Sequence, residues 1–343
     1  MAELGGARGG LPGTVLGVGL TATDGLLAAA LRLAESALAP STRRSYAALW
    51  SEFVGFCTAL GSPALPASRE LVGRWLASRA AAGRGASSSH AIAAVRARHL
   101  ELGFGDPAHD TWLQRVVAGA ERLAAVDRPE RAVRAPLPVA VVGRLLATVP
   151  SWVGLRPGQS AFATATDAHL LAVRDAAVLA IGLRLMRRAG ELAALMVGDV
   201  RLLPDGTTAL WIRRSKTDQL GAGLLLPVDA TGGPTCPVAL LARWAAVRPA
   251  LAARGLGTDA LFVTVTGRPL SRPAISALVA RAASSTGFDG KFSGHSMRIG
   301  GATAAVSAGA SMATVKAVGG WSSDAVRRYI RPFASDLSSR MGL

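Results

Sequence analysis

A short proline-rich segment at residues 126–138 divides this chain into two parts and limits its folding options more than any other feature. The segment, VDRPERAVRAPLP, contains three prolines and few large apolar side chains, a composition typical of a linker. With 343 residues, the chain is long enough for each part to bury a core of its own. We therefore expect one domain at residues 24–125 and a second at residues 139–343. Residues 1–23, rich in glycine and without a signal-peptide core, are interpreted as a disordered leader.

The first part has the apolar periodicity of a helical domain. Ser41 and Thr42 are a candidate N-cap, and the large apolar residues after them recur at helical spacing. They are Tyr46, Leu49, Trp50, Phe53, Phe56 and Leu60. Further helical patterns lie at about residues 69–82, 88–102 and 110–125. Candidates for contacts with a DNA backbone, each equally typical of a solvated helix face, are Arg43, Arg44, Arg96 and Arg98.

The second part combines helical patterns with one pair of strands. Thr207–Arg213 and Gly223–Val228 have the composition of strands and flank a polar turn. Helical patterns precede them at about residues 139–148 and 168–196. Others follow near 237–253, 271–285, 296–308, 312–318 and 323–330. The predicted fold class is therefore mainly α with a small antiparallel β-sheet.

The charge of the chain favours a polyanionic partner. The formal net charge is +16 and the isoelectric point is near 11.5. A surface this basic attracts nucleic acid first, although a basic protein without such a partner is the plain alternative. Cys57 and Cys236 lie far apart and the five histidines are scattered, so we expect no metal site. No apolar run reaches membrane-spanning length, and we expect no membrane partner.

Four segments of the second part contain the residue types of phosphoryl-transfer chemistry, in a fixed order. They are Arg187-Arg188-Ala189-Gly190-Glu191, Arg213-Arg214-Ser215-Lys216, Gly294-His295-Ser296-Met297-Arg298, and the run from Trp321 to Tyr329. Lysine and tyrosine are otherwise scarce, because the only others are Lys291, Lys316 and Tyr46. A specific chemical demand is therefore more plausible where one of them occurs.

These segments resemble the tyrosine recombinase, or phage integrase, family. That family has an Arg three residues before a Glu or Asp, a Lys in a β-hairpin, His-x-x-Arg, a His or Trp, and a nucleophilic Tyr. The resemblance covers about residues 139–331, and it assigns catalytic roles to Arg188, Lys216, His295, Arg298, Trp321 and Tyr329, with Glu191 in support. It also implies that residues 41–125 form the helical core-binding domain, and we expect Arg213 and Arg214 of the hairpin to contact DNA. The step from Trp321 to Tyr329 is shorter than in many bacterial members and looks more like recombinases of eukaryotic mobile elements.

The chemistry of these residue types agrees with that assignment. The guanidiniums of Arg188 and Arg298 can bind the non-bridging oxygens of a phosphodiester and stabilise the charge of the five-coordinate transition state. The phenol of Tyr329 can attack phosphorus and hold the DNA end as a phosphotyrosine, so rejoining needs neither ATP nor a cofactor.

Proton transfer explains the remaining candidates. Lys216 can protonate the departing 5′-oxygen, which an arginine with a pKa above about 12 cannot do. His295 can exchange a proton with the tyrosine or bind the phosphate, and Trp321 can donate its indole N–H or brace the pocket.

Taken singly, each candidate has a plainer interpretation. Arg184 and Arg187 compete with Arg188 for the first position, and Glu191 is equally typical of an ion pair on a helix surface. Alone, Lys216 is typical of a solvated turn, His295 of a helix start, Trp321 of a core, and Tyr329 of a partly buried anchor. It is their joint occurrence in this order that favours the resemblance.

The resemblance implies a site-specific recombinase or integrase that acts on double-stranded DNA through a 3′-phosphotyrosine intermediate. It also implies four protomers on two DNA sites, two on each site. We expect an intracellular, DNA-associated protein, in the nucleus if the host is a eukaryote. The alternatives are a type IB topoisomerase that relaxes supercoils as a monomer, and a DNA-binding protein that descends from a recombinase but no longer cuts.

Overall fold

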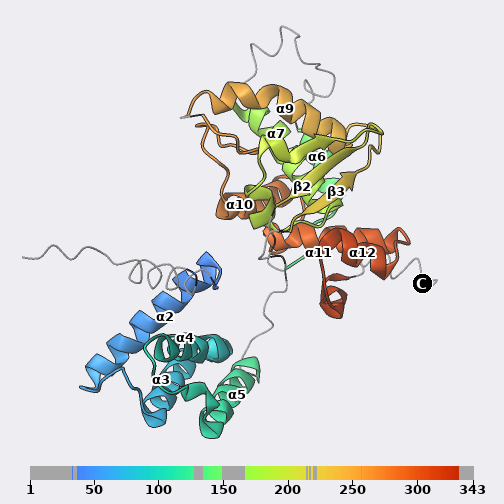
Figure 1. The fold of residues 1–343 in the computed structure, drawn as a ribbon. Helices are drawn as coiled ribbons and strands as arrows, with labels where there is room; N and C mark the ends of the chain where they lie inside the picture. The colour runs from blue at the N-terminus through green and yellow to red at the C-terminus, as the bar shows by residue number, and fades with distance from the viewer. Residues whose placement is uncertain are drawn as a thin grey trace, which may run out of the picture. The chain divides into compact units, whose positions relative to one another are not determined.

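The structure is a computed structural model that describes residues 33, 37–126, 134–148, 167–213, 215, 218, 222–255 and 257–331. The chain forms two compact units, Met1–Pro129 and Glu130–Leu343 (Figure 1). Residues 1–23, the predicted leader, lie outside the described residues, as do Arg214 and Lys216.

The first unit is helical, as its periodicity predicts. Its helices are α2 (Pro40–Ala59), α3 (Arg69–Ala81), α4 (Ser88–Glu101) and α5 (Thr111–Val126), with short 3₁₀ turns η1 (Gly85–Ser87) and η2 (Pro107–His109). The predicted cap at Ser41 and Thr42 is wrong: α2 begins at Pro40, after Ala39, without a side-chain cap. Proline at the first helical position has a preset φ and needs no hydrogen bond for its nitrogen, so it starts the helix earlier.

The core of the first unit contains the middle of the predicted apolar stripe. Phe53 is fully buried and packs on Trp75 with ring centroids 5.0 Å apart, whereas Leu60 at the end of the stripe is 46% exposed. Arg79 is also buried, and its guanidinium pairs with the Glu52 carboxylate at 2.6 Å. This ion pair joins α2 to α3 inside the unit.

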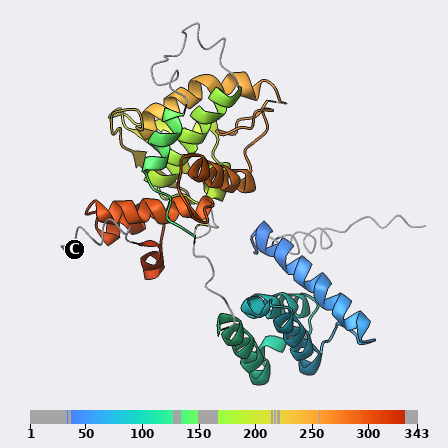
Figure 2. The ribbon, with the colours of Figure 1, turned by 180° about the vertical axis from the view of Figure 1, so that it is seen from behind.

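The second unit is mainly α with one small antiparallel sheet, which confirms the predicted fold class. Its helical elements are α6 (Ala140–Ala147), α7 (Asp167–Arg184), α8 (Ala189–Ala193), η5 (Val197–Asp199), α9 (Pro237–Ala252), α10 (Arg272–Ser285), α11 (Gly294–Ser307), α12 (Met312–Gly319) and η6 (Asp324–Tyr329). In both views, α11 and α12 follow one another along one end of this unit, with the red η6 turn beside them (Figures 1 and 2). This end carries most of the predicted catalytic residues.

The sheet has strand order β1-β2-β3, with β1 (Val200–Leu202), β2 (Thr208–Ile212) and β3 (Leu224–Val228). Leu210 pairs with Leu226, and Ile212 pairs with Leu224 where the hairpin opens. Leu210 and Leu226 are buried in the core shared with α7 and α9. Strand β1 was not predicted, because three residues, two of them exposed, are too few to give a recognisable strand pattern.

The single helix predicted at residues 168–196 is wrong, because the chain turns between α7 and α8. Met186 adopts the left-handed conformation with φ 52°, and the Arg187 N–H donates to the Gly182 carbonyl at 3.0 Å. A non-glycine residue rarely adopts this conformation, and such strain is concentrated at functional sites. The turn places Arg188 at the N-cap of α8.

The described end of the predicted linker packs on the second unit. The Ala135 N–H donates to the Lys291 carbonyl at 3.1 Å, and the Leu137 N–H donates to the Ser296 carbonyl at 3.0 Å. The Leu137 side chain is fully buried. Residues 134–138 are therefore fastened along α11 rather than free in a spacer. Within the described segments, no helix combines the length and apolar character needed to cross a bilayer.

Candidate active site

Arg188 lies at a helix start beside a buried carboxylate. The Glu191 carboxylate accepts hydrogen bonds from the Arg188 backbone N–H at 3.1 Å and from its Nη1 at 2.6 Å. The side chain of Arg188 is 28% exposed, whereas that of Glu191 is 5% exposed. This burial excludes the surface ion pair that the sequence left open for Glu191. The carboxylate therefore orients a guanidinium that is still partly exposed.

Arg187 is buried and bonded to the backbone of two elements. Its Nε donates to the Leu185 carbonyl at 2.7 Å and its Nη2 to the Val318 carbonyl of α12. Its Nη1 lies 3.4 Å from the Glu191 carboxylate. Burial lowers the pKa of Arg187, against the opposing charge of Glu191. Arg187 therefore joins α12 to the turn before α8.

The structure distinguishes the three arginines of this segment, Arg184, Arg187 and Arg188. Arg184 pairs with Asp229 on the surface, and Arg187 is enclosed by protein. The guanidinium of Arg188 is partly exposed, and a carboxylate orients it. Of the three arginines, Arg188 is therefore suited to bind a phosphate.

Arg298 is a buried cation with unused hydrogen-bond donors. It is 1% exposed, and its Nη1 donates to the carbonyls of Met186, at 2.8 Å, and Gly319. The Trp321 ring covers it, with the guanidinium carbon 3.4 Å from the ring centroid. Among the described residues, Nε and Nη2 of Arg298 have no hydrogen-bond partner. Buried charges are normally paired, so these two donors indicate a site for an anion.

The electrostatics around Arg298 also favour an anion. Burial first, and then the charges of Arg188 and Arg187, lower the pKa of Arg298 to about 9. The charge of Glu191 opposes this shift, but one carboxylate does not balance three guanidiniums. A bound phosphate would relieve the repulsion among them.

His295 is the second residue of α11 and faces the predicted nucleophile. Its ring centroid lies 4.9 Å from that of Tyr329, with an interplanar angle of 58°. Partial burial of the imidazole, followed by the positive charges of arginines led by Arg298, lowers the pKa of His295. At pH 7 the imidazole is therefore mainly neutral and able to accept a proton.

Tyr329 lies beside three of the other candidates, His295, Trp321 and Arg298. It is the last residue of η6, and its ring centroid lies 5.1 Å from that of Trp321. The guanidinium carbon of Arg298 lies 5.5 Å from the Tyr329 ring centroid. Trp321 follows Gly320, whose left-handed backbone (φ 66°, ψ 49°) ends α12 and turns the chain back toward Arg298. One face of the second unit therefore combines an imidazole, a phenol and buried guanidiniums.

The β-hairpin approaches Arg188 through a small cavity of about 140 Å³. The walls are formed by Arg187, Arg188, Ile212, Ser215, Asp218, Gly223, Leu224 and Gly320. The Asp218 carboxylate accepts hydrogen bonds from the N–H groups of Ala222 and Gly223, at 3.0 and 2.8 Å, and so orders the base of β3. Lys216 itself lies outside the described residues, although its neighbour Ser215 lines the cavity with Arg188.

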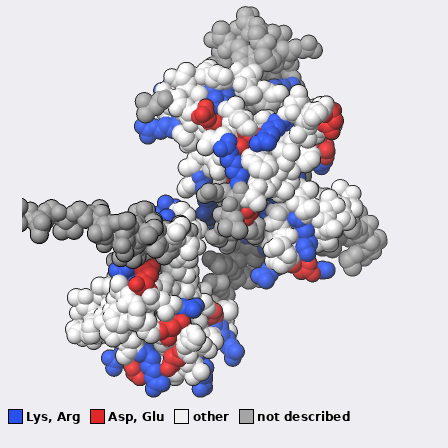
Figure 3. Space-filling model, in the orientation of Figure 1, with Lys and Arg blue, Asp and Glu red and all other residues white. Residues whose placement is uncertain are grey.

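The candidate DNA-binding arginines lie on the surface, several of them beside acidic groups. Arg43 and Arg44 are exposed on α2. Ion pairs join Arg96 to Asp106 at 2.7 Å, Arg98 to Glu101 at 3.0 Å and Arg213 to Asp199 at 2.6 Å. Figure 3 shows basic side chains interspersed with acidic ones on the visible face of each unit. Their roles remain predictions, and Arg214 lies outside the described residues.

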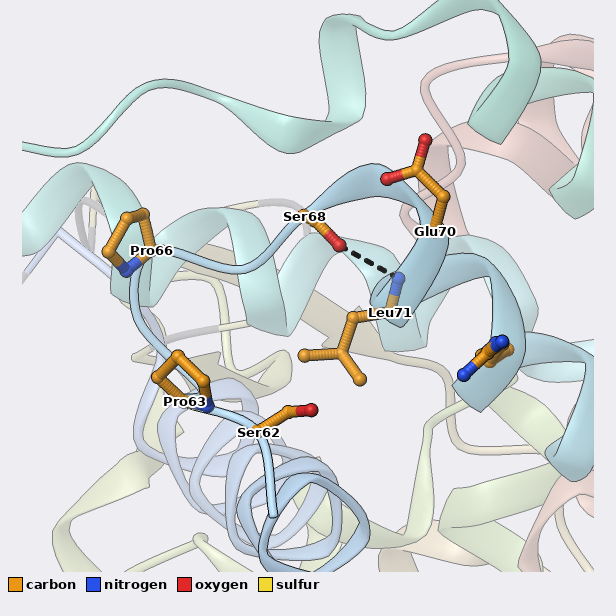
Figure 4. A pocket seen from close by; sticks show the side chains of 7 residues that line it. Ser62, Pro63, Pro66, Ser68, Glu70 and Leu71 are labelled. Carbon is orange, nitrogen blue, oxygen red and sulfur yellow. Dashed lines mark hydrogen bonds between the residues drawn. The ribbon is translucent and has the colours of Figure 1, made fainter. Parts of the chain in front are cut away.

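A cavity of about 340 Å³ in the first unit contains none of the predicted catalytic residues. It lies at the start of α3 and is lined by Ser62, Pro63, Pro66, Ser68, Glu70, Leu71 and Arg74. The Ser68 hydroxyl points to the Leu71 N–H and caps the helix at 3.2 Å (Figure 4). Ser68 is thus used as the helix cap, and the Glu70 carboxylate pairs with Arg69 at 2.8 Å.

Three residues of the site gave no signal in the sequence. Asp218 orders the hairpin, Gly319 leaves room for the Trp321 ring, and Thr303 contacts the backbone on both sides of Ile330. Thr303 acts on a segment 26 residues away, whereas Asp218 and Gly319 act on residues at most five positions away, and residue type and spacing reveal none of these contacts.

Comparison with known proteins gives a consistent result. The sequence profile of the phage integrase family matches residues 159–335. The integrase/recombinase xerD homolog of Selenomonas ruminantium is 26% identical over 287 residues, covering 80% of this chain and 76% of the relative. The XerH recombinase in a post-cleavage complex with palindromic difH has a TM-score of 0.54 at 16% identity, over 84% of this chain and 75% of that one. A lambda integrase dimer bound to a COC′ core site has a TM-score of 0.52 at 16% identity, over 90% and 77%.

Proposed function

Because this chain belongs to the phage integrase family, it is a tyrosine recombinase that cuts and rejoins DNA strands, and we propose that Tyr329 is its nucleophile. The proposed phosphate-binding groups are Arg188 and Arg298, and His295 is the proposed proton acceptor. Trp321 covers the site, and Glu191 orients Arg188.

The observation that supports this assignment best is the state of Arg298. Its Nε and Nη2 are buried without a partner among the described residues, and the Tyr329 ring lies 5.5 Å from its guanidinium carbon. A phosphate oxygen accepts hydrogen bonds from such a fork and compensates its charge. A phosphate held there lies beside the phenol. Since Trp321 and Tyr329 cover Arg298, these rings have to move slightly as the phosphate enters.

In the proposed cleavage step one bond to phosphorus forms and another breaks. The Tyr329 oxygen forms a bond to phosphorus, and its proton passes to the neutral His295. The bond from phosphorus to the 5′-oxygen breaks, and the departing oxygen takes a proton. Lys216 is the proposed donor of that proton, on the sequence pattern alone. In the reverse step a 5′-hydroxyl of a partner duplex attacks the phosphotyrosine and releases Tyr329.

Double-stranded DNA is the substrate, and we further propose two protomers on each DNA site and four on a pair of sites. The solved lambda integrase dimer on a core site supports the smaller assembly by its similar fold. In this arrangement the first unit, with Arg43, Arg44, Arg96 and Arg98, contacts the DNA backbone. Phosphate contacts of this kind make affinity fall steeply with salt.

Covalent trapping tests the nucleophile. Fragmented host DNA is incubated with the full-length protein, denatured, and analysed for DNA that stays attached. Wild-type protein and Tyr46→Phe, which removes the only other tyrosine, are expected to form adducts, and Tyr329→Phe is not. Mass spectrometry after nuclease digestion should then place the nucleotide on residue 329. Adducts of undiminished yield with Tyr329→Phe would refute the assignment.

The adducts also distinguish the recombinase from a type IB topoisomerase and from a DNA-binding protein that does not cut. When the DNA attached to the protein is sequenced, the sequences should converge on a short shared site. Relaxation of plasmids without that site would instead indicate topoisomerase activity, and retarded migration without any adduct would indicate a DNA-binding protein that does not cut.

A further inference from the structure

Thr303 contacts the chain on both sides of the residue that follows the proposed nucleophile. It lies on α11 and is 1% exposed. Its hydroxyl donates to the Tyr329 carbonyl at 3.2 Å and accepts the Arg331 N–H at 3.1 Å. A single buried side chain thus uses both its donor and its acceptor on the segment that carries Tyr329. Threonine is β-branched and stiff at χ1, so its hydroxyl has few alternative positions.

The segment that carries Tyr329 has little other backbone support. It ends η6, a six-residue 3₁₀ helix, and short 3₁₀ helices have poor hydrogen-bond geometry. The cap bond after it, from the Ile330 N–H to the Arg327 carbonyl, is long at 3.4 Å. The Tyr329 ring touches His295 and Trp321, and Val326 of the same turn is fully buried. These side-chain contacts do not bond the backbone at Tyr329 and Arg331, whereas the Thr303 hydroxyl does.

The position of Thr303 on α11 explains why this contact matters for geometry. The same helix carries His295 and Arg298. A helix is rigid over this distance, so one element fixes the proton acceptor, the phosphate-binding guanidinium and the anchor of the nucleophile relative to one another.

A second contact fastens the same segment to the chain that enters the catalytic unit. Arg331 Nη1 donates to the Arg134 carbonyl at 2.8 Å. One residue later, the Ala135 N–H bonds to the Lys291 carbonyl, just before α11. Both flanks of the site are therefore tied to the region around α11.

From these contacts we infer that Thr303 is a positioning residue that holds Tyr329 in line with the phosphate site of its own protomer. The inference rests on the proposed role of Tyr329 as nucleophile. Loss of the hydroxyl frees the Tyr329 backbone on both sides without altering any group that touches DNA. Displacement of a reacting group by about 1 Å lowers a rate on the order of 100-fold. Thr303→Val should therefore slow strand cleavage between about 10-fold and 100-fold and leave DNA affinity within about two-fold.

The first test uses the site recovered by covalent trapping, placed in a nicked duplex that cannot be rejoined. Single-turnover adduct formation and equilibrium DNA binding are measured for full-length Thr303→Val, Thr303→Ser and wild type. Valine keeps the shape and removes the hydroxyl, whereas serine keeps the hydroxyl. Serine is expected to restore cleavage to within about three-fold of wild type. Cleavage by Thr303→Val at the wild-type rate, or failure of serine to restore it in a stably folded protein, would overturn the inference.

The second test needs no DNA and so does not depend on the proposed function. The chain has only two tyrosines, so 3-fluorotyrosine in a Tyr46→Phe background gives one ¹⁹F resonance, that of Tyr329. In wild type this resonance should be shifted by the Trp321 and His295 rings. In Thr303→Val it should move toward the value of free fluorotyrosine, and in Thr303→Ser it should not.

The matched control for both tests is Thr286→Val, at the C-cap of α10. That threonine is also buried, and its hydroxyl bonds to the Ala282 carbonyl away from the site. It should change neither the Tyr329 resonance nor the cleavage rate. An unchanged resonance in Thr303→Val would reject the positioning role even if the enzyme proved inactive. A shifted resonance with no adduct from wild-type protein would instead reject the proposed nucleophile.

Discussion

Replacement of Gly319 by alanine should slow cleavage strongly, although Gly319 is not itself one of the catalytic candidates. Gly319 ends α12, two residues before Trp321. A Cβ atom at Gly319 would lie 1.8 Å from Cζ3 of the Trp321 ring, whereas ordinary contacts begin at 3.4 Å, so the ring has to shift by about 1.6 Å. That ring covers the Arg298 guanidinium and contacts Tyr329. The shift therefore displaces both neighbours of the proposed phosphate.

The magnitude follows from this displacement. A misplacement of about 1 Å at reacting groups lowers a rate on the order of 100-fold, so Gly319→Ala should slow single-turnover cleavage by at least that factor. The stability should change much less. Overpacking costs about 1–3 kcal/mol, and alanine in a helix returns about 1 kcal/mol relative to glycine, so the net loss is at most about 2 kcal/mol.

The assay is cleavage of the nicked duplex together with urea unfolding, and Gly119→Ala is the control. Gly119 is also helical, on α5, but a Cβ there meets nothing within 4 Å. A double-mutant cycle with Trp321→Phe isolates the steric effect, because the smaller ring leaves room for the added methyl group. Gly319→Ala should then cost much less in the Trp321→Phe background. An equal loss in both backgrounds, or full activity of Gly319→Ala, would refute the reasoning.

The charges of the site determine its response to pH, to substitution and to added anions. Because the pKa of His295 is lowered, the cleavage rate should stay constant as pH falls to 6.5 and decline only below that pH. The variant His295→Gln should not show this decline. A decline that begins above pH 6.5 in the wild-type protein would contradict the proposed role of His295. Glu191→Gln leaves the buried Arg187 without its carboxylate and should destabilise the protein by about 3 kcal/mol in urea unfolding, whereas a loss below about 1 kcal/mol would show that the pair contributes little. Sulfate should raise the melting temperature of the DNA-free protein by filling the site at Arg298, and Arg298→Met should abolish the rise; an equal rise in both proteins would exclude this site as the cause.

The sequence predicted those elements whose stability comes from their own periodicity. The predicted helices at residues 69–82, 88–102 and 271–285 agree within a residue or two with α3, α4 and α10. Apolar residues at helical spacing produce the same face in any context, so local pattern was sufficient. The hairpin strands were predicted from their composition and from the polar turn between them.

The turn at Leu185–Arg188 could not be predicted in this way. Leu185 and Met186 are good helix formers, and the sequence continues the apolar pattern of α7 through them. The left-handed Met186 is stabilised from outside the segment, because its carbonyl accepts a hydrogen bond from Arg298, which lies 112 residues away in the sequence. Tertiary contacts of this kind override local propensity, and here they determine where Arg188 lies.

At the candidate site, too, the residue types could be predicted from the sequence but their contacts could not. The order of Arg188, His295, Arg298, Trp321 and Tyr329 gave the chemistry, because a phosphodiester demands those groups. It did not show that Arg298 is enclosed, since burial depends on the Trp321 ring folding back over it.

The enclosure of Arg298 by the Trp321 ring affects the energy of the DNA-free site. Three guanidiniums share one described carboxylate, Glu191, and Arg298 is charged at neutral pH while two of its donors are unpaired. The DNA-free site is therefore a high-energy arrangement, which the rest of the second unit stabilises through its core. In the proposed mechanism a phosphate lowers that energy, and the more highly charged five-coordinate transition state lowers it further, so the strain is released most where the reaction barrier lies. The proposed mechanism then needs no reorientation of the guanidiniums, because the fold holds them in place before DNA binds.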